Sequence, residues 1–263
     1  MKHVLDTSLR PPLIGRAHAA PTLAESFHRI RTVLLSDGDA APRSVLVASA
    51  LHGDGRSTVA ANLAIACSTP GRRVLLVDSD LRKPVQHSIF ELENTHGLAQ
   101  ALSTEGNGEL FVRQVRPSLD LLSSGPSPAD PCELIDSDMM TRLLEFVRQM
   151  YDLVILDSPP IHEFADAVAL ARRVDAIVFV VRSSSTYRDE ASRALKELSR
   201  ANPRVLGAVL NAVPNRSLAG KADPVRLHRR GLPIAAKAPQ PQASVQAVSV
   251  APDPAKSAPA APL

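Results

Sequence analysis

The stretch SALHGDGRSTVAANLA, residues 49–64, places two glycines, a basic residue and two hydroxyl side chains in the order of a phosphate-binding loop. Gly53 and Gly55 would let the backbone curl so that successive N–H groups bind an anion, together with the start of the following helix. The Ser57 hydroxyl would bind Mg²⁺. Thr58 follows it directly and would lie near the base of the nucleotide. The alternative is an ordinary glycine-containing turn between a strand and a helix, with a serine cap.

The basic residue of this loop is Arg56, where the usual pattern has lysine. Arginine keeps the positive charge, but its guanidinium is longer, planar and forked, whereas a lysine ammonium is a compact point charge. Arg56 would therefore hold a phosphate from a shifted position. Because phosphoryl transfer depends on positioning and on electrostatic stabilisation, we expect this change to impair catalysis more than binding.

Three aspartates follow buried strands of the expected fold. Asp78 and Asp80 end the run VLLVDSD, and Asp157 ends VILD. A carboxylate at the end of a second strand would hold Mg²⁺ beside a phosphate loop, and another nearby would orient or deprotonate an attacking hydroxyl. Each aspartate alone is also typical of a turn or a helix cap, but all three together with the loop favour a site. Arg82 would pair with a phosphate or a carboxylate, or form a surface salt bridge.

The elements that must position these residues alternate between strands and helices. Continuous apolar runs predict strands buried on both faces at 43–49, 72–80, 151–160, 176–184 and 204–213, with a weaker one at 119–125. Helical spacing of apolar residues predicts helices at 22–36, about 58–68, 138–150 and 188–200. We therefore predict a three-layer α/β fold, a mostly parallel sheet with helices on both faces that binds ligands at the carboxyl ends of its strands.

Composition divides the chain into a flexible leader, 1–21, a globular domain, 22–213, and a disordered tail, 214–263. The tail holds nine prolines, twelve alanines and no aromatic residue. Its seven Lys and Arg residues and two Asp give it a charge of +5, which leaves −2 for the rest of the chain. A basic tail could touch acidic lipid or nucleic acid, but we favour a solvated extension.

Several other functions are excluded by composition. The chain has no tryptophan and only 3% aromatic residues, which argues against a stacking surface for nucleic acid, so no nucleic-acid partner is expected. Neither a signal peptide nor a membrane span is predicted, since no run approaches 18 apolar residues. Cys67 and Cys132 lack metal or redox spacing, which fits a reducing cytoplasmic location, and Cys67 suits a small core position. His28 and His52 have no partner at metal-binding spacing.

The loop, LLVDSDLRKP (75–84) and VILDSPP (154–160) together resemble the Walker A, A′ and B motifs of the bacterial tyrosine kinases of capsule and exopolysaccharide synthesis. Segments 90–102, 121–140 and 180–186 also resemble that family, so the resemblance covers about residues 22–213. It implies that this region is a kinase-like nucleotide-binding domain with the P-loop NTPase fold, and that its cofactors are ATP and Mg²⁺.

The resemblance also implies roles for individual residues. The catalytic residues would be Arg56, Asp78 and Asp80. The metal ligands would be Ser57, Asp80 and Asp157. The cofactor-binding residues would be Gly53, Asp54, Gly55, Arg56, Ser57, Thr58 and Asn211.

Two kinds of partner are implied. The family normally forms a ring of subunits and cooperates with a membrane protein that sets polysaccharide chain length. This chain resembles the stand-alone cytoplasmic members, which reach the inner face of the membrane through that partner. A ring would form through helix 22–36, where Glu25 and Arg31 fit the family pattern Glu-x-x-Arg-x-x-Arg, but His28 takes the middle position with Arg29 beside it. The alternative is an amphipathic helix packed on its own domain.

The usual phosphate acceptors of the family, tyrosines clustered at the C-terminus, are missing from this tail. The chain has two tyrosines. Tyr151 leads into a core strand and is expected to be structural, whereas Tyr187 follows a serine-rich loop and is the candidate for self-phosphorylation. The missing acceptors and the arginine at position 56 both indicate a weakened kinase.

Three functions compete for this chain. The first is a tyrosine kinase, weakened or acting on another protein. The second is a non-catalytic, nucleotide-binding regulator of the polysaccharide export complex. The third is a partitioning-type ATPase, which the sequence disfavours because such proteins carry an additional lysine where this chain has Leu51. We expect ATP binding to be better retained than phosphoryl transfer.

Overall fold

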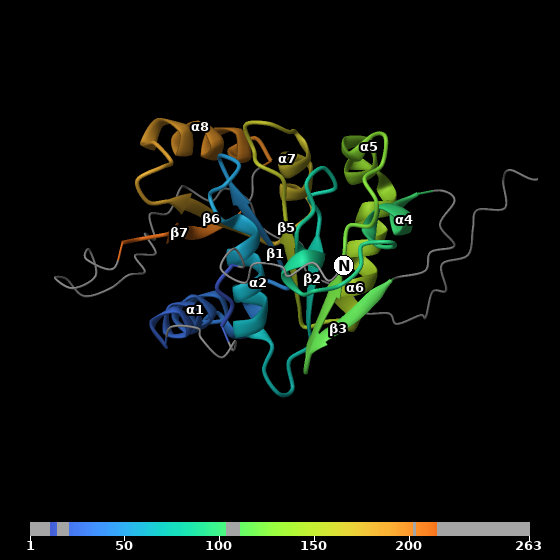
Figure 1. The fold of residues 1–263 in the computed structure, drawn as a ribbon, viewed down its shortest axis with the longest axis horizontal. Coiled ribbons are helices and arrows are strands. Elements are labelled where there is room, and N and C mark those ends of the chain that lie inside the picture. The colour runs from blue at the N-terminus through green and yellow to red at the C-terminus, as the bar shows by residue number, and fades with distance from the viewer. Residues whose placement is uncertain (1–10, 15–20, 104–110, 202–203, 215–263) are drawn as a thin grey trace, which may run out of the picture. The chain divides into compact units, whose positions relative to one another are not determined.

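A seven-stranded sheet forms the centre of the protein in a computed structural model, which describes residues 11–14, 21–103, 111–201 and 204–214 (Figure 1). The strands are β1 (Ser44–Ser49), β2 (Val74–Asp78), β3 (Val112–Arg116), β4 (Leu119–Leu122), β5 (Leu153–Asp157), β6 (Ala176–Arg182) and β7 (Val205–Asn211). Their order in the sheet is β3-β4-β2-β5-β1-β6-β7. All neighbouring pairs are parallel except β3 with β4, so the prediction of a mostly parallel sheet is confirmed. The predicted tail and most of the predicted leader lie outside the described residues.

The central strands divide their side chains between two hydrophobic cores. In β1, Val45 and Val47 enter one core, and Leu46 and Ala48 enter the other. Strands β2 and β5 alternate in the same way, and every residue of the three strands is buried. Because both faces are covered, these strands appear in the sequence as continuous apolar runs rather than as alternating patterns.

Helices supply the two outer layers. The core on one face includes residues of α1 (Pro21–Leu34), α2 (Arg56–Cys67) and α3 (Gln86–Ile89). The other core includes residues of α4 (Leu98–Leu102), α5 (Pro131–Asp136), α6 (Asp138–Met150), α7 (Asp166–Ala171) and α8 (Arg188–Ser199). In Figure 1, α1 lies next to α2, away from α5 and α7. The three-layer α/β architecture is therefore confirmed.

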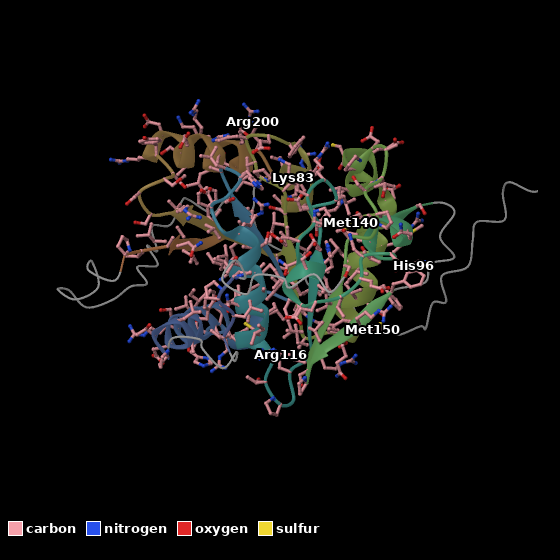
Figure 2. The ribbon with its side chains drawn as sticks, in the orientation of Figure 1. Lys83, His96, Arg116, Met140, Met150 and Arg200 are labelled. Atoms are coloured by element: carbon pink, nitrogen blue, oxygen red, sulfur yellow. The ribbon has the colours of Figure 1, made fainter. Side chains whose placement is uncertain are left out.

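Helix α6 has the bounds that its sequence predicts. The Ser137 hydroxyl accepts a hydrogen bond from the Met140 backbone N–H and so caps its first turn. Met140 is fully buried near one end of the helix, while Met150 is exposed at the other end (Figure 2). Among the described residues, no helix is long and apolar enough to cross a bilayer.

Several boundaries differ from the predicted ones. Strand β2 ends at Asp78 rather than at residue 80, and β5 ends at Asp157 rather than at residue 160, because the chain leaves the sheet at these aspartates. Strand β3 was not predicted, since VRQVR at a sheet edge is short and mostly polar. Helices α3, α4, α5 and α7 were also missed, because four to six residues are too few to show a helical period.

Helix α1 packs its apolar face on its own domain. Three of its side chains are buried in the core shared with α2: Phe27, Ile30 and Leu34. Arg31 Nη1 donates to the Ala66 carbonyl oxygen of α2 at 3.1 Å. On the exposed face, Arg29 pairs with Glu25 at 3.2 Å, one helical turn apart. This packing matches the second of the two interpretations of the helix, and assembly into a ring stays a prediction.

Part of the predicted leader packs against α2. Leu13 and Ile14 are buried in the same core as α2. The fully buried Asn62 of α2 accepts a hydrogen bond from the Ile14 backbone N–H at 2.7 Å, and its Nδ2 donates to the Pro12 and Thr58 carbonyl oxygens at 2.9 Å each. Asn62 therefore fixes a short segment before α1 onto the helix that follows the glycine loop.

Replacing Asn62 with alanine is expected to lower the free energy of unfolding by about 1–3 kcal/mol, because the buried Ile14 N–H and the part-buried Pro12 carbonyl lose their partner. Urea denaturation followed by circular dichroism measures the change. Gln149→Ala, at an exposed position of α6, is the control and should have little effect. An Asn62→Ala protein as stable as the control would contradict this account of the segment.

Candidate functional site

The loop between β1 and α2 has the backbone that its glycines predict. Gly53 and Gly55 adopt φ angles of +86° and +87°, in the left-handed region that favours glycine. Gly55 is the N-cap of α2, and Val59 is the first residue of this turn whose amide bonds back, to the Gly55 carbonyl oxygen. Within the described residues, the N–H groups of residues 53–58 have no hydrogen-bond partner. Such amides at a helix start form a site for an anion.

Side chains from distant segments hold the loop from outside. Asp54 is buried and accepts hydrogen bonds from the Leu51 N–H at 3.0 Å and from Thr186 Oγ1 at 2.6 Å. Arg182 Nη1 donates to the Gly53 carbonyl oxygen at 2.7 Å. Asn211 Nδ2 donates to the Asp54 carbonyl oxygen at 2.9 Å. The turn after β6 and the end of β7 therefore set the shape of the loop.

The Arg56 side chain lies between two carboxylates. Its Nη2 is 3.1 Å from Asp80 Oδ2, and its Nε is 3.3 Å from Asp157 Oδ1. Its Nη1 donates to Ser49 Oγ at 3.1 Å. Arg56 is only 6% exposed, so this is a buried network rather than a surface salt bridge. The guanidinium thus joins the end of β1 to the residues that follow β2 and to the end of β5.

Asp78 is a buried carboxyl that has a hydrogen-bond partner at one of its two oxygens. It is fully buried, and its Oδ2 accepts hydrogen bonds from the Val85 and Gln86 N–H groups at 3.1 and 2.9 Å. Its Oδ1 has no hydrogen-bond partner in the described part of the chain. Burial, and then the neighbouring Asp157 carboxylate, raise the pKa of Asp78 well above its ordinary value. Burial also raises the pKa of Asp157, although Arg56 acts in the opposite direction.

Gln86 connects the three motifs and was not predicted from the sequence. Its Nε2 donates to the Ser57 carbonyl oxygen at 3.0 Å and to Asp157 Oδ2 at 2.8 Å, while its backbone N–H binds Asp78. The side chain is fully buried. A glutamine after the run DLRKP carries no chemical signal in the sequence, so only the fold identifies its role.

The remaining predicted residues divide into those at the site and those near it. Ser57 donates a side-chain hydrogen bond to Asp157, which lowers the pKa of that carboxyl. Thr58 lies in the first turn of α2, where its carbonyl oxygen accepts from Asn62. Arg82 pairs with Asp166 at 2.9 Å and stacks over the Phe164 ring, so it binds a carboxylate.

The residues at these strand ends fit a nucleoside triphosphate with Mg²⁺. The free amides of the loop suit phosphate oxygens. The Ser57 hydroxyl and the Asp80 and Asp157 carboxylates are oxygen ligands of the kind that Mg²⁺ prefers, and Mg²⁺ commonly takes its other ligands from water and phosphate. The unpartnered Asp78 Oδ1 and Ser79 Oγ are buried beside them. Within the described residues no three His, Cys, Asp or Glu side chains cluster as a metal site, so phosphate and water would have to complete the coordination.

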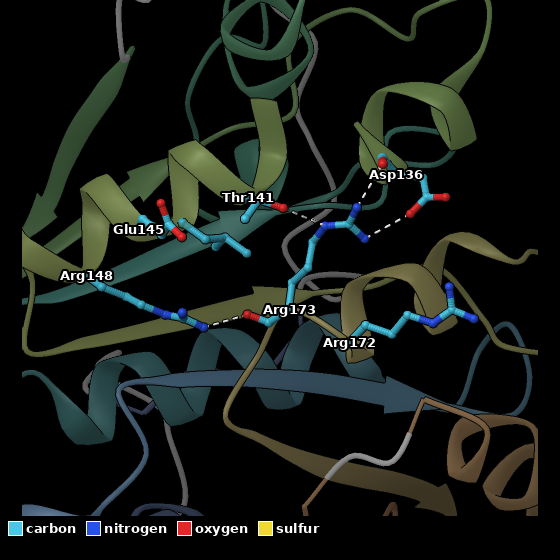
Figure 3. A pocket seen from close by; sticks show the side chains of 7 residues that line it. Asp136, Thr141, Glu145, Arg148, Arg172 and Arg173 are labelled. Atoms are coloured by element: carbon cyan, nitrogen blue, oxygen red, sulfur yellow. Dashed lines mark hydrogen bonds and ion pairs between the residues drawn. The ribbon is translucent and has the colours of Figure 1, made fainter. Parts of the chain in front are cut away.

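A hollow with a volume of about 430 Å³ lies away from the glycine loop, near the start of β1 (Figure 3). Arg173 within it pairs with Asp136 at 3.0 Å and donates to Thr141 Oγ1 at 3.1 Å. Arg148 donates to Ser44 Oγ at the start of β1. The chain itself occupies the guanidinium groups of Arg148 and Arg173, while Figure 3 draws Arg172 without a hydrogen bond or ion pair to the other lining residues.

The loop, the sheet and the carboxylates at neighbouring strand ends define a P-loop NTPase. A family model described as an AAA domain matches residues 43–200. The septum site-determining protein MinD of Pyrococcus horikoshii has a similar fold, with a TM-score of 0.54 at 20% identity, over 64% of this chain and 69% of that one. A likeness at this identity shows the fold alone.

More similar relatives identify the family. The chain is 40% identical over 190 residues to the tyrosine-protein kinase YwqD of Bacillus subtilis, which covers 72% of this chain and 80% of that protein. The crystal structure of the chimerical protein CapA2B2 matches with a TM-score of 0.68 at 36% identity, over 72% of this chain and 84% of that one. The kinase domain of the Escherichia coli tyrosine kinase ETK matches with the same TM-score at 30% identity, over 72% and 75%. The chain therefore belongs to the bacterial tyrosine-protein kinase family, as its motifs predicted.

The two loop glycines are expected to tolerate alanine differently. Both have positive φ, which costs alanine about 1–2 kcal/mol. A Cβ on Gly53 would meet open space, whereas a Cβ on Gly55 would lie 2.0 Å from Asn211 Nδ2. Gly55→Ala should therefore lower the free energy of unfolding more than Gly53→Ala does, as measured by urea denaturation.

A double variant tests whether Asn211 causes the additional loss of stability in Gly55→Ala. Asn211→Ala in the Gly55→Ala background should recover the difference between the two glycine variants, because it removes the atom that overlaps the new methyl group. Equal losses for the two glycine variants would show that the close approach of Asn211 to the loop is not what constrains position 55.

Asp78→Asn is expected to raise stability more at about pH 8 than at about pH 5 in the absence of nucleotide. Because its pKa is raised by folding, Asp78 contributes stability that is complete below its ordinary pKa and is lost as the pH rises through the folded value. Asparagine keeps an accepting oxygen and cannot ionise. Urea denaturation at both pH values tests this expectation.

The matched control is Asp152→Asn, which changes an exposed aspartate that accepts a hydrogen bond from the Arg73 backbone N–H at 2.7 Å. It should not give the same pH-dependent gain. If Asp78→Asn destabilises the protein equally at both pH values, the buried carboxyl is not under electrostatic strain.

Proposed function

We propose that this protein is an ATP-binding member of the bacterial tyrosine-kinase family that regulates capsular or exopolysaccharide polymerisation and export, with weakened phosphoryl transfer. The observation that supports this most is the combination of the family relationship, which includes YwqD, with a glycine loop whose amides are free to bind phosphate. Fold alone would not carry the proposal, because P-loop folds serve many functions.

The residues that would hold the cofactors follow from the site. The amides of residues 53–58 would bind the phosphates, and Ser57, Asp80 and Asp157 would hold Mg²⁺. ATP, when bound, supplies the phosphoryl group for transfer. Asp78, with its raised pKa, is suited to holding a proton at the carboxyl ends of β2 and β5.

Arg56 is the reason to expect weakened transfer. Its guanidinium contacts two carboxylates and a serine hydroxyl, and it would have to exchange these for phosphate oxygens. Such an exchange breaks buried, charge-assisted hydrogen bonds, which are stronger than neutral ones. The same contacts favour a second candidate function, a non-catalytic regulator that binds nucleotide and transfers no phosphate.

Tyr187 is the proposed self-acceptor. It is 77% exposed and directly follows Thr186, which contacts the loop. Tyr151, by contrast, is buried, and its hydroxyl donates to Asp120 Oδ2 at 2.8 Å. Burial and this hydrogen bond raise the pKa of Tyr151 to about 12, so it is structural.

The proposed partner is a membrane protein that controls polysaccharide chain length and activates this chain. We propose that the protein is cytoplasmic and reaches the inner face of the membrane through that partner. A ring of subunits would use helix α1, where Glu25 and Arg31 fit the family pattern and Arg29 pairs with Glu25. A partitioning-type ATPase is less well supported, because the likeness to MinD extends to the fold alone.

Calorimetry with ATP and Mg²⁺, together with labelled ATP and detection of phosphotyrosine, tests the proposal. We expect binding, and weak phosphorylation that Tyr187→Phe abolishes if the chain is its own acceptor. Arg56→Lys should raise transfer by about 10- to 100-fold, because a compact cation is restored to the loop. The membrane partner's cytosolic segment is included as an activator.

Each result separates the two candidates. Binding without phosphotyrosine, even with the partner segment and in Arg56→Lys, would favour the regulator. No binding of ATP or ADP at millimolar concentration would overturn both. Asp80→Asn is the control for specific binding, since it removes a predicted metal ligand.

A further inference from the structure

Arg56 forms ion pairs with both carboxylates that are expected to bind the metal at the strand ends. The Asp80 and Asp157 side chains are 4% and 0% exposed, and Arg56 contacts both of them. The guanidinium uses three different nitrogens, one for each carboxylate and one for Ser49. A lysine ammonium has its three protons on one nitrogen, so its partners must lie closer together than those of a guanidinium.

The other carboxylate oxygens are also occupied by the protein. Asp80 Oδ1 accepts from the Lys83 and Arg82 backbone N–H groups at 2.9 and 3.3 Å. Asp157 Oδ2 accepts from Gln86 Nε2 at 2.8 Å. All four oxygens of the two carboxylates therefore have donors, and their counter-ion is Arg56. A divalent cation would meet two partnered carboxylates and an adjacent fixed positive charge.

We propose that Arg56 makes divalent-metal binding at this site conditional on the nucleotide. Without a triphosphate, the guanidinium takes the place of the metal between Asp80 and Asp157. A triphosphate on the loop amides attracts the guanidinium, which releases the two carboxylates to the cation. This inference rests on the proposed function, since it takes ATP as the ligand of the loop.

Charge balance makes the two ligands depend on each other. Nucleotide without metal would draw Arg56 away and leave two buried carboxylates without a cation. Metal without nucleotide would displace the guanidinium and leave it unpaired beside a dication. Each ligand alone therefore meets a buried, uncompensated charge, which is unfavourable. Linkage requires that each strengthens the binding of the other by the same factor.

Mn²⁺ binding to the nucleotide-free full-length protein, followed by electron paramagnetic resonance, tests this inference. Wild type and Arg193→Met, a change at an exposed arginine of α8, should bind Mn²⁺ weakly at this site. Arg56→Met should bind it at least about tenfold more tightly, because the competing cation is gone. Adding Asp80→Asn to Arg56→Met should abolish the gain.

The outcomes are decisive in both directions. Wild type that binds Mn²⁺ as tightly as Arg56→Met does would overturn the inference, as would a gain that survives Asp80→Asn. Should Arg56→Met fail to fold, Arg56→Gln, which is neutral but can still donate a hydrogen bond, provides the same comparison. Failure of wild type to bind ATP with Mg²⁺ would instead count against the proposed function, because the Mn²⁺ measurement needs no nucleotide.

Discussion

Two buried carboxylates that share one guanidinium form the interaction on which the site depends. Burying an ion is costly, and removing one partner of a buried pair typically costs about 3–5 kcal/mol. Arg56 meets this requirement for Asp80 and Asp157, and Gln86 completes the hydrogen bonding of Asp157. Asp78 accepts hydrogen bonds from backbone amides instead, and burial, followed by the Asp157 carboxylate, raises its pKa well above the ordinary value. The strand ends thus hold three buried carboxyl groups and one guanidinium, which contacts two of them.

This arrangement needs three strands in a fixed order. Strand β5 lies between β1 and β2, and both pairs are parallel, so the carboxyl ends of all three meet at one edge. Asp78 is paired in register with Asp157, which brings two acidic residues side by side. A shift of one residue would turn every side chain of a strand to the other core, so burial on both faces also fixes the position of the aspartates.

The fold was largely predictable because its central strands are buried on both faces and its long helices show clear periods. Helix α6 was predicted with its observed bounds, and the loop and the three aspartates were found as motifs. Other features depend on partners that only the fold brings together. Asp54 accepts a hydrogen bond from Thr186, which lies 132 residues further along the chain. Arg56 contacts carboxylates, although its residue type and position in the motif suggested a phosphate. The edge strand β3 has too little apolar character to be found by pattern.

The contact between the end of β7 and the glycine loop has a consequence for where this domain ends. The family model stops at residue 200, before β7 begins. Yet the Asn211 side chain, at the last residue of β7, supports the Asp54 carbonyl oxygen from 157 residues away. A fragment trimmed to the matched region would retain the whole glycine motif, with its contacts to Arg182 and Thr186, but would lose the contact with Asn211. The smallest intact nucleotide-binding unit therefore extends through Asn211, beyond the boundary that family membership alone would suggest.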